Sequence, residues 1–501
     1  MMRSVVLVGA LAMSAVHAVA AAQTLAFGPA LSEGAVLQRG QQIDISGIAA
    51  PKAGISVTLG EERRDVKADR TGRWRAIFPA RSASDGVSLS AVSGAERLEL
   101  RNIAIGEVFL CSGQSNMQFS MAESAMNLGD RKVAVDRSIS LLSVPIATAR
   151  VEQSAFAKPA SWTNAFSDSA DFSAVCLFAG RAIANAQKVK VGLVDASMGG
   201  TPIEAWLPYE GLKQAGESEG LAILDAFRAD AAAAEARYGP QLDGLWINPP
   251  PPRQDRDRPR MGYANLFNGM VAPLAGTRFA GVIWYQGENN TRRDNPRAAY
   301  ELRLKALLTS WRGRFGADLP FAIVQLAPFG PLSDQPGEHN WAEVREAQRQ
   351  VALEDPKAEL VTTVDVGERL DIHPPLKKPV GLRSAAALSH LLYGTPVETL
   401  GPQPVDAVRK GNSVVIRITG SSNGLMAASW GRPGPMVLCS VTVTPECRFA
   451  DARIISDGIA LDVPEGFAPA LVRYCWGAAP ICNVFDRAQR PLPAFELPIK
   501  L

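Results

Sequence analysis

The feature that most constrains the fold is an alternation of short apolar runs with helical patterns between about residues 103 and 395. The runs Val108–Cys111, Val191–Val194 and Gly281–Tyr285 have the length and composition of buried strands. Between such runs lie segments with helical spacing, of which Pro296–Arg312 is the clearest. Strands that alternate with helices form mostly parallel sheets with helices on both faces. We therefore predict a doubly wound parallel α/β fold for this part of the chain.

The sequence on either side of this stretch is typical of β structure. Short alternating segments such as Ile55–Leu59 and Trp74–Phe78 come before it, and Val414–Ile418 and Ala470–Tyr474 come after it. These patterns predict small β-sandwich-like modules that flank the α/β domain. The predicted organisation is a leader over residues 1–22, an N-terminal β domain over 23–102, the α/β domain over 103–398 and a C-terminal β domain over 399–501.

The first 22 residues have the pattern of a cleaved secretory signal. Arg3 gives a short basic start, Val5–Val19 is almost wholly apolar, and small residues fill positions 18–22. We therefore expect a periplasmic or secreted protein with no membrane segment after cleavage. The 52 basic and 50 acidic residues leave a formal charge of +2, which gives no electrostatic reason to expect nucleic acid as a partner.

The cysteines fit an exported protein. Cys439 and Cys447 form one locally spaced pair, and Cys475 and Cys482 form another, so we predict two local disulfides. Cys111 and Cys176 lie inside apolar stretches, and we predict that both remain reduced in the core. The cysteine and histidine spacings are not those of a structural zinc site, and we expect no metal.

A serine follows the first predicted strand of the α/β domain. Ser115 lies in Gly113–Met117, directly after the strand that ends at Cys111. A serine at a strand-to-helix turn exposes its hydroxyl, and the N-terminus of the next helix favours developing negative charge. A helix-capping serine would explain this pentapeptide equally well.

A serine nucleophile needs a base, and only three histidines remain after the leader. His390 lies in a helical pattern and His339 in a loop rich in Gly and Pro, whereas His373 has a neighbouring carboxylate beyond a predicted strand. Asp371 could hold the imidazole of His373 in the required tautomer. We therefore predict that Ser115 and His373 work together, with Asp371 as the acid.

Two further loops could donate hydrogen bonds to an oxyanion. In Ser197–Thr201 a double glycine would let the backbone N–H of Gly199 approach a substrate oxygen. In Tyr285–Asn290 a strand ends in a cluster of amides, of which Gln286 or Asn289 could donate to the same oxygen.

Taken together, these motifs resemble the sialate O-acetylesterase family of the SGNH/GDSL-type hydrolases. The resemblance extends beyond the α/β domain and covers nearly the whole chain after the leader. It rests on Gly113–Met117, Gly199–Thr201, Trp284–Glu288 and Ile372–Pro374, with Gly34–Arg39, Phe267–Met270, Val472–Tyr474 and Trp476 outside these blocks.

The resemblance implies a role for each matched residue. Ser115 would be the nucleophile and His373 the base, while the Ser115 backbone amide, Gly199 and Gln286 would form the oxyanion hole. Relatives commonly place the acid three residues before the histidine, but that position is Leu370 here. Asp371, two residues before, is therefore the predicted acid, with Asp365 as the alternative, and Asn289 is the alternative to Gln286.

The sequence thus predicts an exported carbohydrate O-acetylesterase that forms an acetyl-enzyme and uses neither a metal nor an organic cofactor. Its partners would be acetylated mono-, oligo- or polysaccharides. One alternative changes the substrate to acetylated xylan or another plant polysaccharide. A second alternative, from a different class, is an inactive carbohydrate-binding or adaptor protein built on a hydrolase core.

Overall fold

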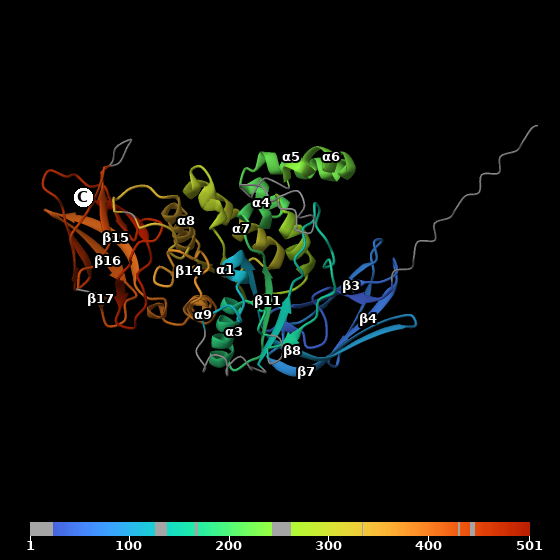
Figure 1. Ribbon diagram of the computed structural model, residues 1–501. Helices are drawn as coiled ribbons and strands as arrows, with labels where there is room; N and C mark the ends of the chain where they lie inside the picture. Colours follow the sequence, from blue (N-terminus) through green and yellow to red (C-terminus); the bar gives the residue numbers. More distant parts are fainter. Residues whose placement is uncertain are drawn as a thin grey trace, which may run out of the picture.

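The computed structural model describes residues 24–125, 138–165, 169–242, 262–332, 334–428, 431–440 and 446–501. Figure 1 shows three parts in a row: an N-terminal β region in blue, a central α/β region, and a C-terminal β region in orange and red. The predicted leader lies outside the described residues. Among the helices that are described, none has both the length and the apolar character that crossing a membrane requires.

The central part is built on the predicted parallel sheet. Its strand order is β10-β9-β11-β8-β12-β13-β14, and every neighbouring pair from β9 to β14 is parallel. Strands β9 and β11 to β14 are almost wholly buried, and so is β8 from Ile103 onward, because helices cover both faces of a parallel sheet, whereas both residues of the edge strand β10 are exposed. Their bounds are β8 (Glu96–Gly113), β9 (Ile139–Ser143), β10 (Thr163–Asn164), β11 (Val191–Ser197), β12 (Gly281–Tyr285), β13 (Phe321–Val324) and β14 (Ala358–Val361).

Alternate residues of the central strand β8 pack into two different cores. Val108 and Leu110 join the core that contains α7 (Pro296–Phe315) and α8 (Asn340–Glu354). Phe109 and Cys111 join the core on the other face, with α3 (Ala174–Gln187) and α9 (Lys377–Tyr393). The doubly wound arrangement and the helix predicted from Pro296 are therefore confirmed. Further short helices follow β11, namely α4 (Tyr209–Gln214), α5 (Ser218–Ala229) and α6 (Ala231–Leu242).

The N-terminal β region is continuous with the central sheet through β8. The first half of this strand pairs antiparallel with β7 (Ser84–Ser93), and its second half pairs in parallel with β11 and β12. The boundary expected between residues 102 and 103 therefore falls inside one strand. The other strands of this region are β1 (Ala26–Phe27), β2 (Val36–Gln38), β3 (Ile43–Ile48), β4 (Gly54–Leu59), β5 (Glu62–Lys67) and β6 (Arg73–Phe78).

The C-terminal β region carries a sheet of order β19-β18-β22-β24-β15-β16-β21-β20. A smaller sheet pairs β17 (Leu425–Ala427) with β23 (Val484–Asp486). The strands of the larger sheet are β15 (Gln403–Lys410), β16 (Ser413–Thr419), β18 (Met436–Cys439), β19 (Cys447–Phe449), β20 (Ala452–Ile455), β21 (Gly458–Asp462), β22 (Leu471–Tyr474) and β24 (Phe495–Lys500).

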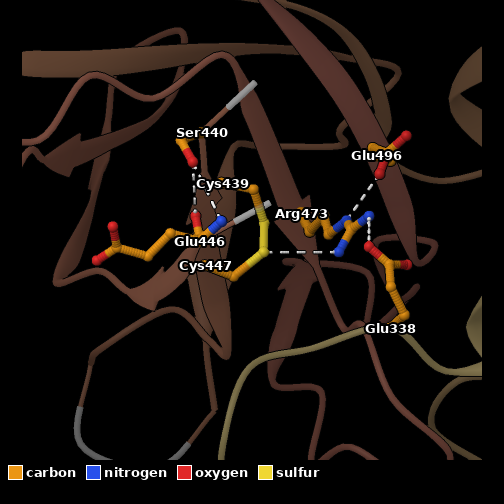
Figure 2. Close-up of a disulfide and its surroundings, with 7 residues drawn as sticks. All are labelled: Glu338, Cys439, Ser440, Glu446, Cys447, Arg473 and Glu496. Carbon is orange, nitrogen blue, oxygen red and sulfur yellow. Dashed lines mark hydrogen bonds and ion pairs between the residues drawn. A yellow bond between two sulfur atoms is a disulfide. The ribbon is translucent and has the colours of Figure 1, made fainter. Parts of the chain in front are cut away.

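A buried arginine joins this sheet to the α/β domain. Figure 2 shows Arg473 of β22 beside the disulfide Cys439–Cys447, with its guanidinium between two carboxylates. It lies 2.7 Å from Glu496 of β24 and 2.7 Å from Glu338 in the loop before α8. The guanidinium and the Glu496 carboxylate are both largely buried, so that contact is shielded from the solvent that weakens exposed ion pairs, whereas the Glu338 side chain is 52% exposed.

The cysteine prediction was correct for two pairs and wrong for the third. Cys439–Cys447 and Cys475–Cys482 are bonded as predicted. Cys111 and Cys176, predicted to be reduced, are also bonded, so all six cysteines form disulfides. Cys111 lies in the buried part of β8 and Cys176 in the first turn of α3, with their Cα atoms 5.9 Å apart, which is a usual disulfide separation. An apolar setting suits a core thiol, but it suits a core disulfide equally well.

Candidate active site

Ser115 lies where β8, β11 and β12 end at the same edge of the sheet. It opens α1 (Ser115–Gln118), a single turn that stops at Phe119, where the backbone becomes extended. The helix expected after Ser115 is therefore present but is only one turn long, and a single turn contributes little of the helix dipole that was expected to favour negative charge here. Gly113 allows the turn, because a side chain there would overlap the carbonyl oxygen of Tyr285.

The structure brings Ser115 and His373 together across 258 residues of sequence. The hydroxyl oxygen of Ser115 is 2.8 Å from Nε2 of His373, which is hydrogen-bond distance. The His373 side chain is 39% exposed, so water or a substrate can reach the pair. This is the arrangement that a nucleophile and its general base require.

Asp371 is beside the histidine, but it is not hydrogen-bonded to the ring. Its Oδ1 is 3.9 Å from Nδ1 of His373 and accepts a hydrogen bond from the backbone N–H of that residue at 2.8 Å. The alternative acid, Asp365, has both carboxylate oxygens 2.7 Å from the guanidinium of Arg383. Of the two candidates, Asp371 is therefore the one whose carboxylate the structure places at the histidine.

The surroundings of His373 favour its neutral form. Partial burial lowers the pKa of its imidazole below the ordinary value, and the nearby ammonium of Lys377 lowers that pKa further. The carboxylates of Asp371 and Glu123 oppose this effect. A neutral imidazole can accept a proton from the serine, which is the property that a general base needs.

Gly199 packs directly against the serine. A Cβ atom at Gly199 would lie 3.1 Å from Cβ of Ser115, closer than ordinary van der Waals contact, so glycine lets the two segments approach without displacement. Its backbone N–H donates to Oε1 of Gln118 at 2.8 Å. In this structure the amide oxygen of Gln118 therefore occupies the N–H group of Gly199 that is predicted to donate to the acyl oxygen of a substrate.

The two amides of the loop after β12 have different surroundings. Gln286 is fully buried, and its Nε2 lies within 3.2 Å of acceptors on Gln114, Thr201 and Asn290. Asn289 is partly exposed, and its Nδ2 donates to the carbonyl oxygen of Gly200 at 2.8 Å. Gln286 thus joins three loops of the site, while Asn289 lies at its accessible side.

Three residues for which the sequence predicts no role form a buried polar group beside the turn that carries Ser115. Asn116 donates to Glu288 at 2.6 Å, and Lys377 donates to the amide oxygen of Asn116 at 2.5 Å. Asn116, Glu288 and Lys377 are all buried. Asn116 and Glu288 are part of the quoted motifs, but Lys377 gave no signal, because a lysine at the start of a helix is usually exposed.

Comparison with known proteins shows which family this chain resembles. A family model described as "Carbohydrate esterase, sialic acid-specific acetylesterase" matches residues 105–220 and 253–384. Sialate O-acetylesterase of Rattus norvegicus is 28% identical, over 79% of this chain and 78% of that protein. The human sialate O-acetylesterase is 26% identical, over 72% of this chain and 69% of that protein.

A solved structure extends the likeness to all three parts of the chain. The crystal structure of a carbohydrate acetylesterase from Xanthomonas citri superposes with a TM-score of 0.79 at 27% identity, covering 94% of this chain and 99% of that one. The family model, for its part, covers the loops that carry Ser115, Gly199 and His373. From the sequence motifs, the fold and these comparisons together, it follows that this chain belongs to the carbohydrate esterase family of sialic acid-specific acetylesterases.

Proposed function

We propose that the protein is an exported serine esterase of the SGNH type that removes O-acetyl groups from sialic acids. The observation that carries this proposal is the 2.8 Å contact between the Ser115 hydroxyl and His373 at the open end of the sheet. The family supplies the substrate class, an acetylated sugar. The three disulfides support export, because such bonds persist in oxidising compartments.

In the proposed mechanism the Ser115 oxygen attacks the acetyl carbonyl while His373 accepts the hydroxyl proton. His373 then gives that proton to the departing sugar oxygen, which leaves an acetyl group bonded to Ser115. Water gives a proton to His373 and attacks the acetyl carbon; the bond from that carbon to the Ser115 oxygen then breaks, the oxygen takes the proton from His373, and acetic acid leaves as acetate. Asp371 would orient the imidazole and stabilise its protonated form.

The backbone N–H groups of Ser115 and Gly199 are the proposed core of the oxyanion hole. Because Gln118 accepts the Gly199 hydrogen bond in this structure, the acyl oxygen has to displace the Gln118 amide as it enters. Gln286 and Asn289 are the two candidates for a third donor. The partial exposure of Asn289 favours it, since a donor must reach the incoming oxygen.

The function is tested by acetate release from O-acetylated sialic acids, measured for the full chain and for Ser115→Ala. Release by the wild type alone would support the proposal. Release only from acetylated xylan would support the plant-polysaccharide alternative. If the wild type and the variant are equally inactive on every acetyl ester, the chain would be the carbohydrate-binding protein of the other alternative.

An unperturbed histidine has a pKa of about 6.5. We expect the acid limb of the kcat/KM profile to lie at a lower pH than that value. His373 must be neutral to act, so activity is full above its pKa and is lost as the pH falls through it. Burial and Lys377 lower that pKa, whereas the Asp371 carboxylate raises it. Asp371→Asn should therefore move the limb to still lower pH. An upward movement in that variant would contradict the assigned environment of His373.

The two amide candidates should differ in what their loss changes. If Asn289 donates to the oxyanion, Asn289→Ala should lower kcat by about 10²-fold with little change in KM, because the bond strengthens as charge develops. Gln286→Ala should mainly lower the melting temperature, since it removes the buried hydrogen bonds by which this amide joins Gln114, Thr201 and Asn290. Steady-state kinetics and thermal unfolding of both variants check this. A selective kcat loss in Gln286→Ala would return the role to Gln286.

A further inference from the structure

We propose that Lys377, acting through Asn116, is a positioning residue that fixes the turn carrying Ser115 relative to the loop carrying His373. This inference rests on the proposed function, because it concerns how Ser115 and His373 are kept together. Asn116 directly follows Ser115 in sequence, and Lys377 lies four residues after His373. The contact between them therefore joins the two segments that carry the reacting groups.

The amide of Asn116 connects three loops. Its Nδ2 donates to Oε1 of Glu288 at 2.6 Å and to the backbone carbonyl oxygen of Ile372 at 2.9 Å. Ile372 directly precedes His373, so one side chain joins the neighbours of both reacting residues. The amide oxygen of Asn116 accepts from Nζ of Lys377 at 2.5 Å. Both amide hydrogens and the amide oxygen are thus in use, and this fixes the orientation of the amide.

Lys377 is held in a site where a lysine is rarely found. It is 0% exposed, and its Nζ lies 4.5 Å from the ring centre of Phe119 and 5.8 Å from that of Tyr285. Burial lowers the pKa of this ammonium to about 7, while Glu288, Asp371 and Glu123 oppose the decrease. A buried lysine is costly, because its charge has left water. Here the ammonium is used to orient Asn116, and a charged donor makes that hydrogen bond stronger than a neutral one.

The position of Lys377 also gives it an electrostatic effect that a purely structural residue would lack. The charged groups that act on His373 are Lys377 and Asp371 on its own segment and Glu123 on the loop after α1, while Glu288 acts on Lys377. Lys377 is the cation among them and disfavours a second positive charge on the imidazole. Removal of this ammonium should raise the pKa of His373, whereas removal of the Asn116 amide leaves the ammonium in place.

The experiment compares Lys377→Met and Asn116→Ala in the full chain, with Lys378→Met as the matched control from the same helix. It measures kcat, KM and the pH profile of kcat/KM on an aryl acetate, and the rate at which a fluorophosphonate labels Ser115. A misplacement of reacting groups by about 1 Å can cost about 10²-fold in rate, so both test variants should lose about that much in kcat with KM unchanged. Lys377→Met alone should also move the acid limb to higher pH.

Several outcomes would overturn the inference. One is that both variants keep the kcat, labelling rate and acid limb of Lys378→Met. Another is that their activity falls only in proportion to the unfolded fraction seen in thermal unfolding, which would make the group merely structural. If Lys377→Met does not fold, the kcat and labelling rate of Asn116→Ala decide. If the wild type is labelled at Ser115 but releases no acetate from sialic acids, the proposed function fails, and the labelling rates still test the positioning role.

Discussion

Ser115→Ala is expected to lower kcat on an aryl acetate by about 10⁴–10⁶-fold, and His373→Ala by a similar factor. The reason is that the two groups perform one step: without the serine oxygen no bond forms to the acetyl carbon, and without the imidazole the hydroxyl keeps its proton. The 2.8 Å contact between them makes this dependence mutual. The variant that lacks both side chains should consequently be no slower than either single variant.

The measurement is kcat for the two single variants, the double variant and a matched histidine control. His390→Ala serves as the control, because Nδ1 of His390 contacts the carbonyl oxygen of Thr395 at the end of α9, away from the serine. That variant should retain the wild-type kcat. Losses that multiply in the double variant would show that Ser115 and His373 act independently, and would contradict the proposed pair.

The second large effect concerns stability. Replacement of both Cys111 and Cys176 by Ala should lower the free energy of unfolding by about 4 kcal/mol, according to the chain-entropy estimate for a bridge across 65 residues. The same estimate gives about 2.5 kcal/mol for Cys439–Cys447, which spans only 8 residues. The difference arises because a longer closed loop removes more freedom from the unfolded chain.

Urea unfolding of the two double-alanine variants tests this order. The Cys111/Cys176 variant should unfold at the lower urea concentration, and the unreduced wild-type protein should show no free thiol after denaturation. A reactive thiol at Cys111 in the wild type would contradict the bridge. A larger loss from the short bridge than from the long one would show that strain or residual structure, and not chain entropy, decides its contribution.

Much of the site could be predicted because its chemistry is local in sequence. Ser115 and His373 each lie in a short motif after a strand, and the scarcity of histidine left few possible bases. The parallel sheet brings strand ends together, so the meeting of the two residues followed from the fold. The positions of Asp371 and of the Asn289 and Gln286 amides depend instead on how each loop bends, and motif spacing does not determine that.

Two features could not be predicted from the sequence, for different physical reasons. Cys111 and Cys176 are 65 residues apart in apolar surroundings, so only the packing of α3 on β8 shows that they can bond. Lys377 is buried because Asn116 and the rings of Phe119 and Tyr285 surround its ammonium. Neither contact leaves a periodic pattern, since each is made between segments that are distant in the chain.

The long strand β8 has a consequence for how this chain can be divided. Residues 96–113 form one continuous strand, and β2 pairs with its middle at Ala104–Gly106. The side chain of Gln38 also accepts a hydrogen bond from the backbone N–H of Val108. A catalytic fragment trimmed to start at residue 103 would lose the first seven residues of the strand that presents Ser115, together with its lateral support. The N-terminal β region therefore supports the strand that leads to Ser115. Exchanging this region for that of another protein, as if it were an independent domain, would disturb the serine at the other end of the strand.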